Sequence, residues 1–110
     1  LVKTSDSHQS VQAVFAHSDE DGLGALQAIK TAGLSPNDIS IVSINGIQDV
    51  CKAIIAEEYL GTVESNPKWG FIVKDLINQK ERGYTPFPTV IIPYSVITEA
   101  NAVSYFPTAY

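Results

Sequence analysis

The sequence predicts an α/β protein with three layers, in which helices cover both faces of a mainly parallel sheet. Two observations lead to this fold class. Short apolar or β-branched runs alternate with longer segments that carry apolar residues at helical spacing, and short loops join them. The run VQAVFA at residues 11–16 is mostly apolar, which is typical of a parallel strand buried on both faces.

Composition bounds what the chain does. It has 110 residues, of which 45% are hydrophobic and 17% charged, and this suits one globular domain. A net charge of −5 without a basic cluster argues against nucleic acid as a partner. No apolar run approaches the roughly 20 residues of a membrane span. The single cysteine, Cys51, excludes an internal disulfide and a cysteine-built zinc site, and we expect neither a cofactor nor a metal ion.

The expected elements alternate along the chain. Strands are predicted at residues 11–16, 39–44, 61–65 and 89–92. Helices are predicted at residues 19–32, 47–58, about 67–82 and 99–105, the third with Asn66 as its cap and Pro67 at its first position. Residues 1–10 are interpreted as a linker or frayed end, 11–105 as the domain, and 106–110 as a tail without a signal. Since residues 1–10 lack the pattern of a signal peptide and an initiator Met, we expect a mature or truncated product.

The helix faces identify an expected core. Leu26 and Ile29 lie on the inner stripe of the first helix, and Cys51 lies on that of the second, as a small buried apolar residue. In the third helix Trp69 is in phase with Ile72 and Val73, which favours a core position over an aromatic platform at a cleft.

A polar turn joins the first strand to the first helix and is a candidate ligand site. Ser18 stands at the N-cap position, and Asp19, Glu20 and Asp21 follow in the first turn, where the helix dipole favours carboxylates. Ser18 as a plain cap and Ser18 as a ligand contact remain alternatives. The adjacent Gly22-Leu23-Gly24 lies within the helix and lacks a third glycine, so it indicates close packing of the helix on the sheet rather than a dinucleotide fingerprint. Consecutive His17, Ser18 and Asp19 do not form a catalytic triad, and we expect no enzyme.

Three segments resemble a known family in order and spacing. They are AVFAHSDEDGLGALQAIKTAGL, ISIVSINGIQDVCKAI and GTVESNP. Together they are similar to the C-terminal part of the sugar-binding proteins of bacterial ABC transporters, of the ribose and galactofuranose type and the type I periplasmic binding fold. The resemblance covers roughly residues 11–97. It implies a C-terminal fragment of a two-lobed protein, with the sugar held between the lobes.

The resemblance also implies site residues. Ser18 stands where the family usually has Asn, followed by the expected Asp19. Asn45, before Gly46, stands where the family usually has Asp, and a third contact is expected from Glu64 or Ser65. The amide of Asn45 still donates to and accepts from sugar hydroxyls, without the charge-assisted bond of a carboxylate.

The implied function is monosaccharide binding without catalysis, for an ABC importer, in the periplasm or at the cell surface. Implied partners are a monosaccharide, the importer's membrane subunits, and either the N-terminal lobe or a second copy of this chain. Two alternatives remain open from the residues: the effector lobe of a sugar-responsive repressor, and an oligomerising module without a ligand.

Overall fold

A computed structural model describes residues 11–110 and contains one four-stranded sheet. The strands, in the order in which they lie in the sheet, are β1 (Ala13–Phe15), β2 (Ser40–Asn45), β3 (Gly61–Glu64) and β4 (Val96–Thr98). The first three are parallel, and β4 runs antiparallel to β3 at the edge. The prediction of an α/β fold with a mainly parallel sheet is confirmed.

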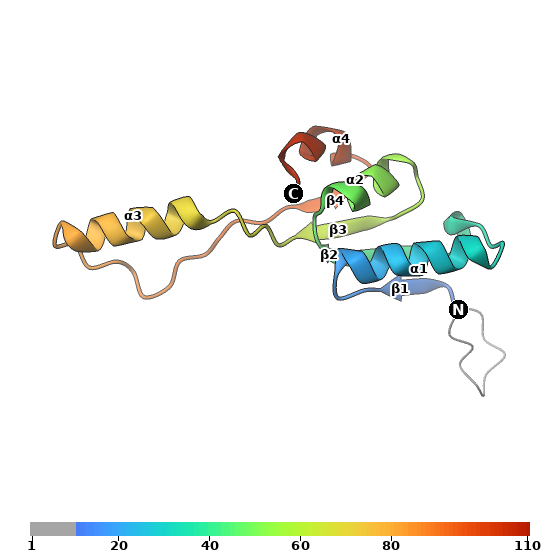
Figure 1. Ribbon diagram of the computed structural model, residues 1–110, viewed down its shortest axis with the longest axis horizontal. Coiled ribbons are helices and arrows are strands. Elements are labelled where there is room, and N and C mark those ends of the chain that lie inside the picture. Colours follow the sequence, from blue (N-terminus) through green and yellow to red (C-terminus); the bar gives the residue numbers. More distant parts are fainter. Residues whose placement is uncertain (1–10) are drawn as a thin grey trace, which may run out of the picture.

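Four α-helices accompany the sheet in the described part of the chain (Figure 1). They are α1 (Asp19–Thr31), α2 (Gln48–Ile55), α3 (Gly70–Glu81) and α4 (Ala102–Tyr105), with short 3-10 turns at Pro36–Asp38 and Phe106–Thr108. The first two begin and end close to the residues that the periodicity predicts. Within residues 11–110, no helix combines the length and apolarity that a membrane crossing requires.

The core lies on one face of the sheet. Ile41 of β2 and Ile97 of β4 are fully buried there. The residues packed around them come from α1, α2, α4 and their connections, and include Leu26, Ile29, Val50, Cys51 and Ile54. Each such side chain contributes about 1.5–3 kcal/mol when fully buried, so this one cluster accounts for most of the hydrophobic stabilisation of the domain.

The opposite face of the sheet differs from the prediction. Phe15 of β1 is 62% exposed and Val96 of β4 is 57% exposed. Within residues 11–110 no helix covers this face, so the described chain has two layers rather than three. Strand β1 is also shorter than predicted and is not buried on both sides. An apolar run indicates a strand whose two faces are suited to burial. It does not show that the layers covering those two faces belong to the same chain.

Gly22 and Gly24 play different roles in α1. A Cβ built on Gly22 would lie 1.8 Å from Oη of Tyr59, a residue that is 5% exposed. A Cβ on Gly24 would meet no atom within 4 Å. Helix α1 therefore packs closely at Gly22, but against Tyr59 in the connection before β3 and not against the sheet as predicted, and it makes no close contact at Gly24.

The segment of residues 66–94, between β3 and β4, extends away from the sheet as an arm that carries α3 (Figure 1). Helix α3 differs from the prediction in two ways. It begins at Gly70 with Trp69 as its N-cap, and Asn66 Oδ1 accepts a hydrogen bond from Lys68 N at 2.8 Å in a turn that precedes the helix. None of its residues is buried, and Trp69 at its N-cap is 46% exposed. The prediction of a core position for Trp69 is wrong. The apolar stripe was recognised correctly, but no described residue covers it.

The last strand is also placed differently. Residues 89–92 form no strand, and Ile91 is 84% exposed. Instead the chain returns from the arm and pairs with β3 further on, where Val63 lies opposite Val96 and Glu64 N donates to Ser95 O at 2.8 Å. The β-branched run at 89–92 is intrinsically suited to a strand, but within residues 11–110 no strand lies beside it to pair with.

Candidate functional site

The carboxyl ends of the parallel strands bring the predicted site residues to one edge of the sheet. Asn45 and Glu64, the last residues of β2 and β3, are register partners. Ser18 and Asp19 follow β1 after a two-residue turn and open α1. Parallel sheets place ligands at this edge, outside the strand ends. The sequence-based expectation that these turns lie side by side is met in the geometry, while their contact with a ligand stays a prediction.

Ser18 acts as the N-cap of α1. Its backbone is extended, with φ −140° and ψ 158°, and its Oγ accepts a hydrogen bond from Asp21 N at 3.2 Å. The side chain is half-buried. The cap uses Oγ as an acceptor and leaves the hydroxyl hydrogen free to donate. Ser18 is therefore able to cap the helix and to donate to a ligand at the same time.

Asp19 lies beneath the site and is fully buried. Its Oδ1 accepts hydrogen bonds from the Ser43 and Thr62 hydroxyls, the latter at 2.6 Å. Its Oδ2 accepts from the backbone N–H groups of Gly46 at 2.7 Å and Ile47 at 2.8 Å. Four donors fill the usual capacity of a carboxylate. Asp19 therefore joins β2, β3 and the start of α2 to the first turn of α1, and it presents no free oxygen to a ligand.

Asn45 lies at the centre of the site, and its backbone has an uncommon conformation. Its φ is 144°, outside the usual range of a non-glycine residue, and it is followed by Gly46 with φ 81°. A Cβ on Gly46 would lie 3.0 Å from Ile97 Cδ1 and 3.3 Å from Glu64 Cα. Glycine is required there by both the backbone angle and the close approach. The pair forms a tight turn that directs the chain into α2.

The Asn45 side chain is held at both ends. Its Oδ1 accepts a hydrogen bond from Asp19 N at 3.4 Å, and its Nδ2 donates to Tyr110 Oη at 3.4 Å. On the main chain, Ser65 N donates to Asn45 O at 2.9 Å. An amide offers two N–H donors and two acceptor lone pairs. One donor and one lone pair of Asn45 thus have no partner in the described chain.

Glu64 and Ser65 form the neighbouring wall. Glu64 is half-buried, and its Oε1 accepts from Asn66 Nδ2 at 3.3 Å. Ser65 is exposed, and its backbone oxygen accepts from Tyr110 Oη at 3.0 Å. Burial, and after it the nearby Glu64 carboxylate, raises the pKa of the Tyr105 phenol well above its ordinary value. Tyr105 therefore stays protonated next to this wall at physiological pH.

The C-terminal segment contributes to the site, which the sequence did not indicate. Tyr110 reaches both Asn45 and Ser65 through its hydroxyl, although residues 106–110 were expected to be an uninformative tail. Ala109 is 3% exposed and belongs to the core. A single tyrosine after a Pro-containing turn has no local pattern that marks it as part of a site 65 residues away. Only the fold brings it there.

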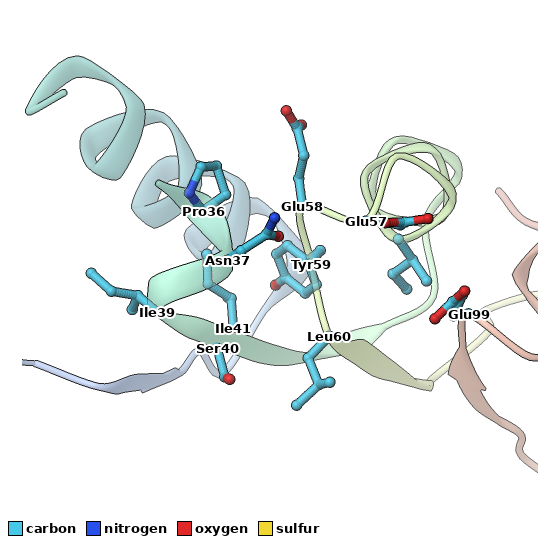
Figure 2. Close-up of a pocket in the computed structure, with 11 residues that line it drawn as sticks. Pro36, Asn37, Ile39, Ser40, Ile41, Glu57, Glu58, Tyr59, Leu60 and Glu99 are labelled. Atoms are coloured by element: carbon cyan, nitrogen blue, oxygen red, sulfur yellow. The ribbon is translucent and has the colours of Figure 1, made fainter. Parts of the chain in front are cut away.

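A cavity of about 210 Å³ lies at the opposite edge of the sheet (Figure 2). It is lined at the amino-terminal ends of β2 and β3 by Ser40, Ile41 and Leu60, with Glu57 and Glu99 at its rim. None of the predicted site residues lines it. This cavity is therefore a separate feature from the candidate site.

The architecture and the polar edge define the class of protein to which the chain corresponds: an α/β domain whose mainly parallel sheet gathers polar turns at the carboxyl ends of its strands. Comparison with known proteins agrees with this. The profile of the periplasmic binding protein-like domain matches residues 3–68, more than half of the chain. The chain belongs to the periplasmic binding protein-like domain family.

Characterised relatives are sugar-binding proteins. The chain is 40% identical over 68 residues to the galactofuranose-binding protein of Escherichia coli, covering 61% of this chain and 21% of that protein. It is 43% identical over 61 residues to the ribose import binding protein of E. coli, covering 56% of this chain and 20% of the relative. The chain thus spans about a fifth of the length of these relatives. They are named as binding proteins, not as enzymes.

Solved structures share the fold. The periplasmic binding protein component of the arabinose ABC transporter of Shewanella sp. ANA-3, bound to α- and β-L-arabinofuranose, superposes with a TM-score of 0.80 and 36% identity. The match covers 92% of this chain and 34% of that one. A galactofuranose-binding protein superposes with a TM-score of 0.78 and 33% identity, over 87% of this chain and 33% of the other. The prediction of a type I periplasmic-binding-protein-like fold is confirmed.

Proposed function

We propose that this chain supplies one wall of a monosaccharide-binding site, in the solute-binding component of a sugar ABC importer. The observation that carries the proposal is the convergence of Ser18, Asn45 and Ser65 at the carboxyl edge of a parallel sheet, with free hydrogen-bonding capacity at each. The relatives and solved structures that bind furanose sugars or ribose support the ligand class.

The roles differ among the five predicted site residues. Ser18 donates its hydroxyl hydrogen, and Asn45 offers one N–H and one carbonyl lone pair. Glu64 and Ser65 add acceptor and hydroxyl groups to the adjacent wall. Asp19 does not contact the sugar, because all its lone pairs are used inside the protein. It fixes the positions of the turns that do.

The chemistry suits a neutral polyol. Sugar hydroxyls both donate and accept, so a wall that offers both donors and acceptors suits adjacent hydroxyl groups. The single wall leaves the other side of the sugar in water, and closure of two lobes normally supplies the desolvation that gives tight binding. We therefore expect the 110-residue chain to bind monosaccharides weakly.

Titration of the chain with pentoses and hexoses, furanose forms included, tests the proposal. We expect chemical-shift changes at Ser18, Asn45 and Ser65 in NMR spectra recorded at high sugar concentration. Asn45→Ala should abolish them. Asn37→Ala, at the cavity on the opposite edge, should not. Absence of any response to every sugar would refute ligand binding by this chain.

The same proposal includes the partners and the location. The second wall comes from the N-terminal lobe or from a second copy of this chain, and the loaded protein delivers its sugar to the importer's membrane subunits. Its place is then the periplasm or the cell surface. The relatives are named as binding components, which gives no support to a repressor lobe.

A further inference from the structure

Tyr110 connects two of the proposed site residues through one hydroxyl group. Its Oη donates to Ser65 O at 3.0 Å and accepts from Asn45 Nδ2 at 3.4 Å. Its backbone oxygen accepts from Gln48 N at 3.0 Å, at the start of α2. The residue is therefore fixed at both its main chain and its side chain.

The position of Tyr110 does not depend on its hydroxyl group alone. The preceding Ala109 is buried in the core, and its backbone oxygen accepts from Lys68 Nζ at 3.3 Å and from Gln48 Nε2 at 3.4 Å. These contacts hold the segment in place without the phenol hydroxyl. A change confined to that hydroxyl therefore alters the Asn45 and Ser65 contacts and leaves the segment docked.

The Tyr110 hydroxyl and the Asp19 backbone N–H together determine which way the Asn45 amide faces. Tyr110 Oη already gives its only hydrogen to Ser65 O, so it meets Asn45 as an acceptor and requires an N–H there. At the other end Asp19 N is a donor and requires the amide oxygen. A flipped amide would set oxygen against oxygen and N–H against N–H. One orientation is thus selected, with one N–H and one lone pair of Asn45 left over.

We propose that Tyr110 is a positioning residue of the ligand site, which holds the Asn45 amide in the orientation that a pair of adjacent sugar hydroxyls requires. This inference rests on the proposed function for its ligand and on the hydrogen bonds alone for the orientation. With the amide fixed, its free N–H and its free carbonyl lone pair have defined positions. The site then accepts sugars whose adjacent hydroxyl groups present an acceptor to the N–H and a donor to the lone pair.

The substitution Tyr110→Phe tests the inference, with Tyr94→Phe as the matched control, since Tyr94 is 69% exposed on the arm. The first readout needs no ligand: the side-chain NH₂ resonances of Asn45, identified by their loss in Asn45→Asp. We expect Tyr110→Phe to shift these resonances while the melting temperature changes little, and Tyr94→Phe to leave both unchanged. Unchanged Asn45 resonances in Tyr110→Phe would overturn the inference.

The second readout is sugar affinity. Loss of a fixed hydrogen-bonding orientation should weaken binding of the sugars that the chain accepts by about five-fold, the effect of one neutral hydrogen bond. Equal affinity of Tyr110→Phe and the parent chain would overturn the positioning role. If the parent chain responds to no sugar but the Asn45 resonances still move in Tyr110→Phe, the proposed function fails for this chain, and the orientation by Tyr110 is supported independently.

Discussion

Asp19 is predicted to be the most sensitive polar residue of the domain. Substitution by alanine removes an acceptor shared by four donors. The Ser43 and Thr62 hydroxyls are able to rotate toward other acceptors, but the backbone N–H groups of Gly46 and Ile47 are fixed. Each buried donor left without a partner costs about 1–3 kcal/mol. We therefore expect Asp19→Ala to lower the free energy of unfolding by about 3–5 kcal/mol.

Asp19→Asn separates the loss of charge from the loss of hydrogen bonds. Its amide oxygen can face the two backbone N–H groups, and its NH₂ group can donate to the two hydroxyls, which then act as acceptors. All four contacts remain, but they become neutral. Hydrogen bonds to charged groups contribute about 1.5–3 kcal/mol against about 1 for neutral ones, so we expect an intermediate cost of about 2 kcal/mol.

The assay is urea denaturation followed by circular dichroism. Asp21→Asn is the control, because Asp21 is an exposed carboxylate in the same first turn of α1 and shares its interaction with the helix dipole. We expect less than about 1 kcal/mol there. For a domain of this size 1 kcal/mol corresponds to about 4–8 °C in melting temperature. If Asp19→Ala costs no more than Asp21→Asn, the four contacts do not stabilise the fold and the reasoning fails.

The remaining predictions concern packing and pH. Gly22→Ala should lower the free energy of unfolding by about 1–3 kcal/mol, because the added methyl group overlaps the buried Tyr59 phenol. Gly24→Ala should raise it by up to about 1 kcal/mol, because no atom lies near and alanine favours the helix. Thermal melts that rank the two variants in the opposite order would contradict this packing. Ile54→Ala should lower the free energy of unfolding by about 2–5 kcal/mol, because Ile54 is buried, whereas Ile77→Ala should lower it by less than about 0.5 kcal/mol, because Ile77 is 54% exposed. Equal losses in urea denaturation would show that α3 is covered in solution. Burial, and after it the charge of Asp19, raises the pKa of the Cys51 thiol above its ordinary 9.0, so the unfolded chain ionises first and stability falls as the pH rises above that value. Denaturation at several pH values measures this fall. We expect the free energy of unfolding of Cys51→Ala to decrease less steeply with pH just above 9.0 than that of the parent chain, and an equal slope would contradict the prediction.

The local elements of the fold were predictable from the sequence because their signals are local. The cap Ser18, the apolar stripe of α1 and the β-branched run of β2 lie within single elements. The same holds for the site turns, since parallel strands place their carboxyl ends together whatever their partners are. Asn45 and Glu64 could therefore be assigned to one edge before any contact between them was known.

The role of Asp19 was not predictable, because its partners are distant in sequence. Ser43 and Thr62 lie 24 and 43 residues away. Within its own turn Asp19 looks the same as Glu20 and Asp21, which are exposed carboxylates at a helix N-terminus. Burial distinguishes it from them, and burial is a property of the assembled fold. Tyr110 was missed for the same reason, and more completely, since it has no local pattern at all.

The arm shows the converse case, in which a strong local signal has no partner within the described chain. The period of Ile72, Val73 and Ile77 identifies an apolar face, but a period does not identify what the face contacts. Trp69 and Ile77 remain about half exposed. The edge with Asn45 and the uncovered face of α3 thus both lack a second surface.

Asn45 and Tyr110 also fit each other in a way that explains the amide at this position. The family resemblance implies an aspartate there. With Tyr110 donating to Ser65 O, its oxygen is available only as an acceptor, and an aspartate at position 45 would place a carboxylate against it. The phenol would then have to abandon Ser65, and a second carboxylate would lie close to the fully occupied Asp19. The amide instead satisfies Tyr110 and Asp19 N together, and it keeps one donor and one acceptor for a ligand. The loss of charge at this position is therefore compatible with the polar wall that we propose.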